Sequence, residues 1–377
     1  MSEEIDLTKE ENQVEKEEAG VVAITTPFNP NMIRIRRDPF TISELVDKME
    51  HGEIRFDTPF QRKSDLWDEE KQSRLIESLL LKLPLPAFYF DETDTDEDAE
   101  VWNVIDGLQR CSVFKNFIVD KTMELQRLEF LSDQYDGKGY DELPRTMQRR
   151  ISQTPITVYV IEKGTPEEVK FNIFKRINTG GLILTPQEIR HAMNQGVSAK
   201  LVAEMAVMPS FVEATCGIIK TDRMEDRDFV TRFLAFYLQD YHTYEPDMDG
   251  FMTKGMALIK KLSDEERQKM KSDFDKAMKT SFSIFENDAF RKRRYKEDRR
   301  KPINKALFET LSVCFAKCTD EERERLIANK RIVKDSFIEL NRDDKFFYAL
   351  SSGTGQKESV NYRHRKICEL VDGVLKG

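Results

Sequence analysis

A chain of 377 residues with 39% hydrophobic and 34% charged side chains has the balance of a soluble globular protein and is long enough for two domains. No run of about 18 apolar residues occurs and the N-terminus is acidic, so the sequence predicts neither a membrane span nor a signal peptide. The five cysteines include no Cys-x-x-Cys pair and the four histidines are far apart, which excludes a His-based zinc site and predicts a reduced, cytoplasmic protein.

The net charge of −9 is unevenly distributed along the chain. Residues 1–20 hold eight acidic side chains and two lysines without hydrophobic periodicity, so we expect residues 1–28 to form a disordered tail. A helix is predicted after Thr41, because Thr41 and Glu44 have the spacing of a capping box and Gly52 can end the helix.

An extended stretch, 56–67, leads to a second predicted helix with Asp68 as its N-cap. Its apolar face comprises Leu75, Ile76, Leu79, Leu80 and Leu83. Two short strands are then predicted in "PLPAFYF" and "VWNVI", and the acidic stretch 91–100 is expected to be the exposed turn between them.

Asp106 and Gly107 interrupt the second of these strands, and the residues that follow have helical spacing, so the chain is predicted to turn there from strand to helix. A short helix ending in "MQRR" and the strand "PITVYVIE" come next. Two further helices are predicted to begin at Thr165-Pro166 and Thr185-Pro186, each with a glutamate in its first turn.

Beyond about residue 190 the patterns are almost entirely helical, which places a boundary between domains 29–195 and 196–377. The predicted helices are 198–208, 226–241, 252–261, 264–285, 303–317, 320–340 and 357–375. The stretch "SGTGQKES" lacks the second glycine of a phosphate loop, so we predict an ordinary flexible loop there.

The strand-to-helix corner carries residue types that suit an anion site. The first backbone N–H groups of a helix lack intrahelical partners, and Gly107 would let a phosphate approach them. Arg110 could bind phosphate oxygens through its fork, Gln109 a further oxygen or a water, and Asp106 a magnesium ion. The structural alternative is that Asp106 is only an N-cap and Arg110 a surface residue.

A second polar group lies in "FNIFKRINTGG". Asn172 and Arg176 are four residues apart and so share one face of the predicted helix, with Asn178 at its end. This face beside a Gly-Gly loop suits a polyphosphate, and it also describes a solvated helix face with a C-cap.

Two further features leave alternatives open. Residues 291–301 hold eight basic side chains against two acidic ones, which predicts either contact with nucleic acid phosphates or a solvated surface linker or helix. The DNA-binding candidates in this segment are Arg291, Lys292, Arg293 and Arg294. Cys314 and Cys318, four apart on a predicted helix, are either half a metal site or two buried thiols on one face.

Three stretches in order, "FQRKSDLWDEEKQSRLIESLLLKLPLPAFYF", "VIDGLQR" and "FKRINTGGLILTPQEIR", resemble the N-terminal domain of the GmrSD-type restriction endonucleases. That domain is related to the ParB and sulfiredoxin-like superfamily, and the resemblance covers residues 40–195 in detail. It implies an α+β protein: a ParB/sulfiredoxin-like, nucleotide-binding domain with a small mixed sheet, followed by a mostly α-helical domain.

In that family the corner usually reads Asp-Gly-Gln-Gln-Arg and is associated with nucleotide binding and hydrolysis. The resemblance implies catalytic roles for Asp106, Gln109 and Arg110, with Asp106 as ligand of a Mg²⁺ ion that binds together with a nucleoside triphosphate. Leu108 replaces the family's first Gln, a change that would weaken hydrolysis while binding survives. The residues placed around the nucleotide are Gln61, Arg62, Gly107, Asn172, Arg176, Asn178, Thr179 and Gly180.

The resemblance implies a magnesium-dependent nucleoside triphosphatase in a restriction or phage-defence system that acts on or senses DNA. The alternative is a nucleotide sensor without turnover whose helical half binds DNA or a protein. Many relatives carry a His-Asn-His nuclease domain, but only His242 and His364 follow residue 195, so a separate nuclease subunit is an expected partner. Direct cleavage by the N-terminal domain is a third alternative, and the oligomeric state is left open.

Overall fold

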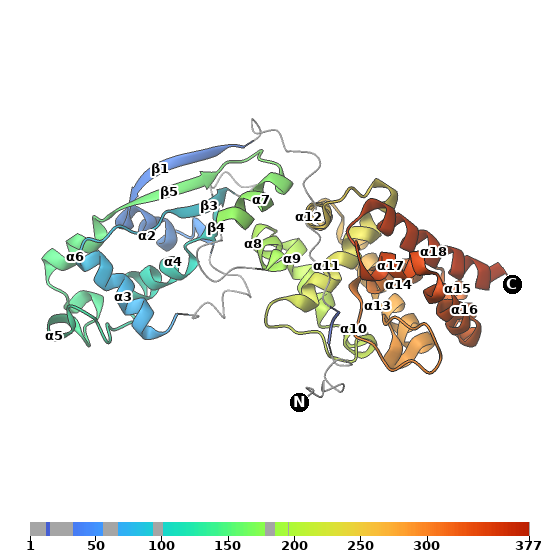
Figure 1. The fold of residues 1–377 in the computed structure, drawn as a ribbon. Helices are drawn as coiled ribbons and strands as arrows, with labels where there is room; N and C mark the ends of the chain where they lie inside the picture. The colour runs from blue at the N-terminus through green and yellow to red at the C-terminus, as the bar shows by residue number, and fades with distance from the viewer. Residues whose placement is uncertain are drawn as a thin grey trace, which may run out of the picture. The chain divides into compact units, whose positions relative to one another are not determined.

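The computed structural model of this chain describes residues 13–15, 33–55, 67–92, 101–177, 185–194 and 196–376. The chain divides into two compact units. The N-terminal unit comprises Phe28–Leu184 and Glu188–Met193, and the C-terminal unit comprises Met1–Pro27, Thr185–Gln187 and Asn194–Gly377. A small mixed sheet with helices forms the N-terminal unit and the C-terminal unit is mostly helical, which confirms the predicted α+β class (Figure 1).

Five strands form the sheet in the order β1-β5-β3-β4-β2. β1 (Ile35–Thr41) lies antiparallel to β5 (Pro155–Ile161), and β5 runs parallel to β3 (Phe88–Glu92). β3 lies antiparallel to β4 (Trp102–Asp106), which pairs in parallel with the two-residue β2 (Ile54–Arg55). β3 and β5 therefore run in one direction and β4 in the other.

β1 is an edge strand that the sequence patterns do not predict. It pairs with β5 along its whole length, from Ile35 opposite Ile161 to Thr41 opposite Pro155. Its sequence, IRRDPFT, carries arginines and a proline instead of alternating apolar residues. Charged residues and proline are tolerated at the edge of a sheet, because one side of the strand makes no ladder hydrogen bonds.

Helices cover both faces of the sheet. Phe88, Phe90 and Trp102 point to the face covered by the first group of helices, and Ile105 and Ile161 point to the opposite face. The first group comprises α2 (Ile42–Glu50), α3 (Glu69–Leu80), α4 (Leu108–Phe114), a π-helical turn (Lys115–Val119), α5 (Ser132–Tyr135) and α6 (Arg145–Ser152). The opposite face packs against α7 (Glu167–Ile177) and α8 (Pro186–Met193).

Local capping signals determine where the first helices begin. The Thr41 N–H donates to the Glu44 carboxylate at 2.7 Å, and the Glu44 N–H donates to Thr41 Oγ1 at 3.3 Å. Asp68 accepts from the Lys71 N–H at 2.8 Å and so caps α3. Both predicted helix starts are confirmed.

The predicted end of α3 is wrong. The helix ends at Leu80, because Lys82 adopts a left-handed φ of 61° and Pro84 follows. Leu83, which we expected on the buried face of the helix, lies beyond its end with 50% of its surface exposed.

Helices α9 to α18 build the C-terminal unit. The predicted helices are found as α9 (Val197–Ala206), α11 (Glu225–Leu238), α12 (Met248–Ile259), α13 (Asp264–Phe285), α14 (Lys305–Lys317) and α18 (Lys357–Lys376). The single helix predicted over 320–340 is wrong: the chain breaks at Asn329 into α15 (Asp320–Ala328) and α16 (Lys330–Arg342). The sequence patterns did not predict α10 (Pro209–Ala214) and α17 (Asp344–Ser351). None of the described helices is both long enough and apolar enough to cross a lipid bilayer.

A buried charge cluster joins three helices of the C-terminal unit. Glu309 on α14 has no exposed surface and accepts hydrogen bonds from Arg232 Nε on α11 at 2.5 Å and from Arg363 Nε on α18 at 2.7 Å. Burial raises the pKa of Glu309, but the charges of Arg363 and Arg232 outweigh burial and lower the pKa to about 2. Glu309 is therefore ionised and holds α11, α14 and α18 together.

Part of the predicted disordered tail is ordered. The Glu15 N–H donates to the carbonyl of Ile303 at 2.8 Å, and Val14 pairs with Ile303 in an isolated bridge. The prediction is therefore wrong for residues 13–15. The predicted exposed turn over 91–100 is wrong for Asp91 and Glu92, which are buried at the end of β3. The rest of the predicted tail and residues 93–100 lie outside the described residues.

Candidate functional site

The predicted strand-to-helix corner is present at residues 106–110, which we call the corner. β4 ends at Asp106, Gly107 is the N-cap residue of α4 with φ 100° and ψ 9°, and the helix begins at Leu108. A Cβ atom on Gly107 would lie 2.6 Å from Cδ1 of Phe88 and 3.2 Å from Nη2 of Arg110. Glycine is therefore required for two reasons, the left-handed backbone and the close approach of neighbouring side chains.

A β-bulge lies directly before the corner. Phe90 pairs with Val104 and Tyr89 pairs with Asp106, so Ile105 is an extra residue in β4. A bulge locally increases twist and changes the direction of the next side chain. Here it brings Asp106 level with Tyr89, which stacks on Tyr159 with 5.0 Å between ring centroids.

Arg110 is buried and bound to the protein itself. One guanidinium nitrogen, Nη1, donates to the carbonyl of Pro86, and Nη2 donates to the carbonyl of Ala87 at 3.1 Å and to Asp106 Oδ2 at 2.8 Å. The guanidinium also lies over the ring of Phe88, 4.2 Å from its centroid. Burial lowers the pKa of Arg110, opposed by the charge of Asp106.

These contacts bear on both expectations for Arg110. It is not a surface residue, because only 7% of its surface is exposed. Three of its five N–H groups are used within the described structure, so at most two remain for a phosphate. The direct effect of Arg110 is to fix the position of Asp106.

The Asp106 side chain is about one-third exposed, at 36%. Arg110 binds its Oδ2 atom, and no described residue donates a hydrogen bond to its Oδ1 atom. Gln109 is half-buried and makes no side-chain hydrogen bond among the described residues. The corner thus offers an oriented carboxylate and an amide, both partly open to solvent.

The corner can supply part of a magnesium site. Carboxylate oxygen is a typical ligand of Mg²⁺, which keeps several waters and binds through one or two carboxylates plus substrate phosphates. No cluster of three or more metal-ligating side chains occurs in the described ranges. Asp106 therefore fits a magnesium ion held mainly by a phosphate ligand and water.

α7 lies on the other face of the sheet and is fixed by a buried ion pair. Lys170 Nζ lies 2.8 Å from Asp91 Oδ1, and both side chains are at least 94% buried. Phe171 and Phe174 pack in the apolar cluster that contains Ile105. α7 also contacts β4, the strand that ends at the corner.

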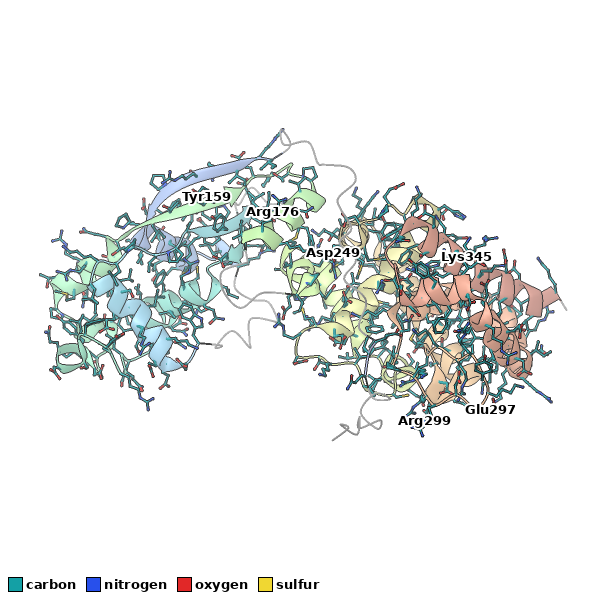
Figure 2. The ribbon with its side chains drawn as sticks, in the orientation of Figure 1. Tyr159, Arg176, Asp249, Glu297, Arg299 and Lys345 are labelled. Atoms are coloured by element: carbon teal, nitrogen blue, oxygen red, sulfur yellow. The ribbon has the colours of Figure 1, made fainter. Side chains whose placement is uncertain are left out.

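The two described nucleotide-binding candidates on α7 differ in exposure. Asn172 is half-buried and Arg176 is exposed near the C-terminal end of the helix (Figure 2). The remaining candidates from the sequence lie outside the described residues: Gln61, Arg62, Asn178, Thr179 and Gly180. The structure thus describes Asp106, Gly107, Gln109 and Arg110 at the corner. The placement of the five candidates outside the described residues stays a prediction.

A buried polar group beneath α7 was missed by the sequence analysis. Asn103 on β4 is only 4% exposed and is the register partner of Asp91 on β3. Neither polar atom of its side-chain amide has a hydrogen-bond partner among the described residues. The sequence did hold one sign of this group. Lys170 lies next to apolar positions of the predicted helix, and a lysine on the face that packs against the sheet needs a buried polar partner.

The four DNA-binding candidates belong to the C-terminal unit and contact the protein itself. Arg291 is 2% exposed, and its Nε donates to the carbonyl of Asn287 at 3.0 Å. Lys292 pairs with Glu15 at 2.6 Å, Arg293 with Asp288 at 2.6 Å, and Arg294 with Asp344. DNA binding by these residues stays a prediction, and the exposed cations of the same segment are Lys296, Arg299 and Lys301.

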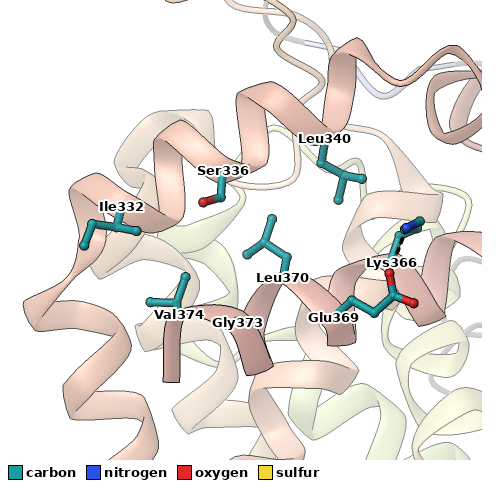
Figure 3. A pocket seen from close by; sticks show the side chains of 8 residues that line it. All are labelled: Ile332, Ser336, Leu340, Lys366, Glu369, Leu370, Gly373 and Val374. Carbon is teal, nitrogen blue, oxygen red and sulfur yellow. Dashed lines mark hydrogen bonds and ion pairs between the residues drawn. The ribbon is translucent and has the colours of Figure 1, made fainter. Parts of the chain in front are cut away.

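An apolar groove of about 360 Å³ lies between α16 and α18 (Figure 3). Ile332, Leu340, Leu370 and Val374 line it, and Lys366, hydrogen-bonded to Glu369, lies at one end. None of the residues predicted to bind nucleotide or DNA lines this groove.

Comparison with known proteins gives a family match over part of the chain, mostly within the N-terminal unit. Residues 42–194 match the family described as the GmrSD restriction endonuclease, N-terminal domain. The matched range contains the corner, α7 and α8, which confirms the resemblance predicted from the three sequence motifs. No curated protein matches the chain.

Proposed function

Because residues 42–194 match the GmrSD restriction endonuclease N-terminal domain, we propose that the chain is a nucleoside-triphosphate-binding and hydrolysing component of a restriction or phage-defence system. The observation that carries the proposal concerns the Asp106 carboxylate: Arg110 holds one of its oxygens, and no described residue donates to the other. An open carboxylate at a glycine corner is suited to bind Mg²⁺ together with the phosphates of a nucleotide.

In this proposal the residues of the corner have separate roles. Asp106 binds Mg²⁺, and Gln109 orients a water or a phosphate oxygen. Arg110 positions Asp106, since most of its N–H groups are bound to Pro86, Ala87 and Asp106. The phosphate charge is neutralised mainly by cations from other segments, for which Arg62 and Arg176 are our candidates.

The test measures binding and phosphate release with each of the four common nucleoside triphosphates, with Mg²⁺ and with a chelator. We expect Asp106→Asn to lower magnesium-dependent release by about 100-fold or more, because the carboxylate ligand is lost. Asp133→Asn is the matched control, since Asp133 is an exposed carboxylate of the same unit, and it should leave release unchanged. If no triphosphate is bound or hydrolysed by the wild-type protein, the proposal is wrong.

A specific observation supports the second candidate function, a nucleotide sensor without turnover. Leu108 occupies the position of the family's first Gln and packs against the apolar cluster of the N-terminal unit. The sensor alternative predicts tight binding without phosphate release, and it predicts that Leu108→Gln gains release. Release by the wild-type protein contradicts it.

Binding of DNA by the C-terminal unit would require exposed cations, and the structure identifies which to change. The variant Lys296→Gln, Arg299→Gln, Lys301→Gln removes exposed charges from the basic segment (Figure 2 labels Arg299). If this segment binds DNA, we expect the slope of log affinity against log salt to fall by roughly 2 to 3.

The matched control for the DNA experiment removes three exposed lysines of the same unit outside the basic segment: Lys254, Lys260 and Lys261. An equal loss of affinity in both variants would mean that only net charge matters. That result would contradict a specific DNA contact of the basic segment.

A further inference from the structure

A row of four side chains crosses the sheet at the level of the corner. In the pairing register, Tyr89 on β3 lies opposite Asp106 on β4 and beside Tyr159 on β5. Tyr159 in turn lies opposite Arg37 on β1, the edge strand. Directly paired residues of neighbouring strands point to the same face of a sheet. These four residues, which we call the cross-strand row, therefore share the face that carries the Asp106 carboxylate.

The neighbouring row on the same face is covered by α7. It contains Ile161 and Asp91, each two residues beyond a tyrosine of the cross-strand row, and Asn103. All three are buried, and Asp91 lies 2.8 Å from Lys170 of α7. The cross-strand row is more open, because its two tyrosines are half-buried and its arginine is exposed. A bound molecule can therefore reach the cross-strand row beside α7.

The two tyrosines present hydroxyl groups beside the carboxylate. Their rings stack on each other with 5.0 Å between centroids and an interplanar angle of 14°. Side chains of a strand stand roughly perpendicular to the sheet, so the hydroxyl groups are the parts furthest from it. Neither hydroxyl has a hydrogen-bond partner in the part of the chain that the structure describes. Two hydrogen-bond donors thus remain available next to Asp106.

Tyr89 keeps its proton at neutral pH. Burial raises the pKa of its phenol, and the charges of Tyr159 and Asp106 raise it further, against the opposing charge of Arg110. A protonated phenol can donate to an anionic oxygen, whereas a phenolate would repel it. Tyr89 is therefore suited to a phosphate oxygen beside the proposed Mg²⁺ ligand.

Arg37 supplies a positive charge at the other end of the row. It is exposed and makes no ion pair among the described residues, while the neighbouring Arg36 binds Asp38 at 2.7 Å. From Asp106 to Arg37 the row crosses three strand spacings, which corresponds to about 14 Å. A nucleoside triphosphate in an extended conformation has a comparable length, so one nucleotide could contact all four side chains.

We propose that the cross-strand row binds the nucleotide lengthwise, with its phosphates at Asp106 and its nucleoside toward Arg37. This inference rests on the proposed function, because it requires a magnesium-bound nucleotide at the corner. Tyr89, the member of the row next to Asp106, donates to a phosphate oxygen. Tyr159 binds the ribose, and the Arg37 guanidinium stacks on the base or donates to its acceptor atoms.

The test measures affinity by calorimetry in the presence of Mg²⁺. Its probes are inorganic tripolyphosphate and non-hydrolysable analogues of the four common nucleoside triphosphates. Tyr89→Phe should weaken the binding of both kinds of probe about 10-fold, because a hydrogen bond to a charged oxygen is lost. Tyr159→Phe and Arg37→Gln should weaken only the nucleotide analogues, by about 3- to 10-fold. Phenylalanine keeps the ring, so the stack of the two side chains is preserved.

Tyr140→Phe and Arg149→Gln are the matched controls. Tyr140 is a half-buried tyrosine of the same unit that packs against the apolar cluster on the other face of the sheet. Arg149 is an exposed arginine on α6. Neither substitution should change the affinity for either kind of probe.

A measurement on the wild-type protein covers the case in which a variant does not fold. Nitration with tetranitromethane, followed by peptide mass spectrometry, reports how accessible each tyrosine is. A saturating nucleotide analogue should slow the nitration of Tyr89 and Tyr159 several-fold and leave that of Tyr140 unchanged. Unchanged nitration of Tyr89 and Tyr159 in the presence of the bound analogue overturns the inference.

Failure of this inference can be distinguished from failure of the proposed function. If the wild-type protein binds neither tripolyphosphate nor any nucleotide analogue, both are wrong. If Asp106→Asn weakens binding but Tyr89→Phe does not, only the lengthwise placement is wrong. An equal loss of tripolyphosphate and nucleotide affinity in Arg37→Gln likewise contradicts the placement of the nucleoside toward Arg37.

Discussion

Glu309→Gln is expected to lower the free energy of unfolding of the C-terminal unit by about 3 to 5 kcal/mol. Glu309 has no exposed surface, and its carboxylate is the shared partner of Arg232 and Arg363, which are 3% and 0% exposed. A neutral amide removes the negative charge that both buried guanidinium groups bind. The chain's two tryptophans, Trp67 and Trp102, lie in the N-terminal unit, so far-UV circular dichroism should follow this helical unit.

The pH dependence of stability gives an independent measure of the same group. The pKa of Glu309 is about 2 in the folded protein and 4.5 is its ordinary value, so its contribution is complete above pH 4.5 and is lost as pH falls toward 2. The difference corresponds to about 3 kcal/mol. In Glu309→Gln the loss of stability across this pH range should be smaller by that amount.

A matched control for this prediction is Glu369→Gln. Glu369 is exposed and pairs with Lys366 at 2.8 Å and with Arg365 at 3.1 Å. Ion pairs in solvent contribute little, so we expect a change below about 1 kcal/mol. Equal effects of the two substitutions would contradict a central role for the buried cluster.

Gly107→Ala is expected to destabilise the N-terminal unit by about 2 to 4 kcal/mol and to remove the nucleotide binding that we propose for the corner. The methyl group would lie 2.6 Å from the ring of Phe88, and the backbone has a φ of 100° that side chains disfavour. Either Phe88 moves, which disturbs its contact with the Arg110 guanidinium, or the backbone of the corner changes conformation. Tryptophan fluorescence reports the unfolding of this unit, and nucleotide titration reports the corner.

Gly52→Ala separates the effect of the positive φ from the effect of the close contact with Phe88. Gly52 also has a positive φ, 71°, but nothing lies within 4 Å of the position of a Cβ atom. Only the cost of the backbone conformation applies there, so we expect a loss of about 1 to 2 kcal/mol and unchanged nucleotide binding. A Gly107→Ala protein as stable as Gly52→Ala, with binding intact, would show that the corner tolerates the methyl group.

Short-range signals determined much of this fold from the sequence. The capping box of Thr41 and Glu44 and the Asp68 cap act within three residues, so the starts of α2 and α3 could be predicted without knowledge of the rest. The strand-to-helix corner depends likewise on adjacent residues, Asp106 and Gly107. β1 could not be predicted, because an edge strand is held by backbone pairing with β5 and needs no apolar pattern of its own.

The sequence by itself determined the helix starts, the glycine corner and the motifs of the GmrSD N-terminal domain, since each is encoded by neighbouring residues. The tertiary structure alone decided the partners of the buried charged side chains. Arg110 binds carbonyls 23 and 24 residues before it in the chain, and Lys170 pairs with Asp91. The physical reason is that such partners are brought together by packing of whole elements, and burial then determines which charges must be paired and which remain open.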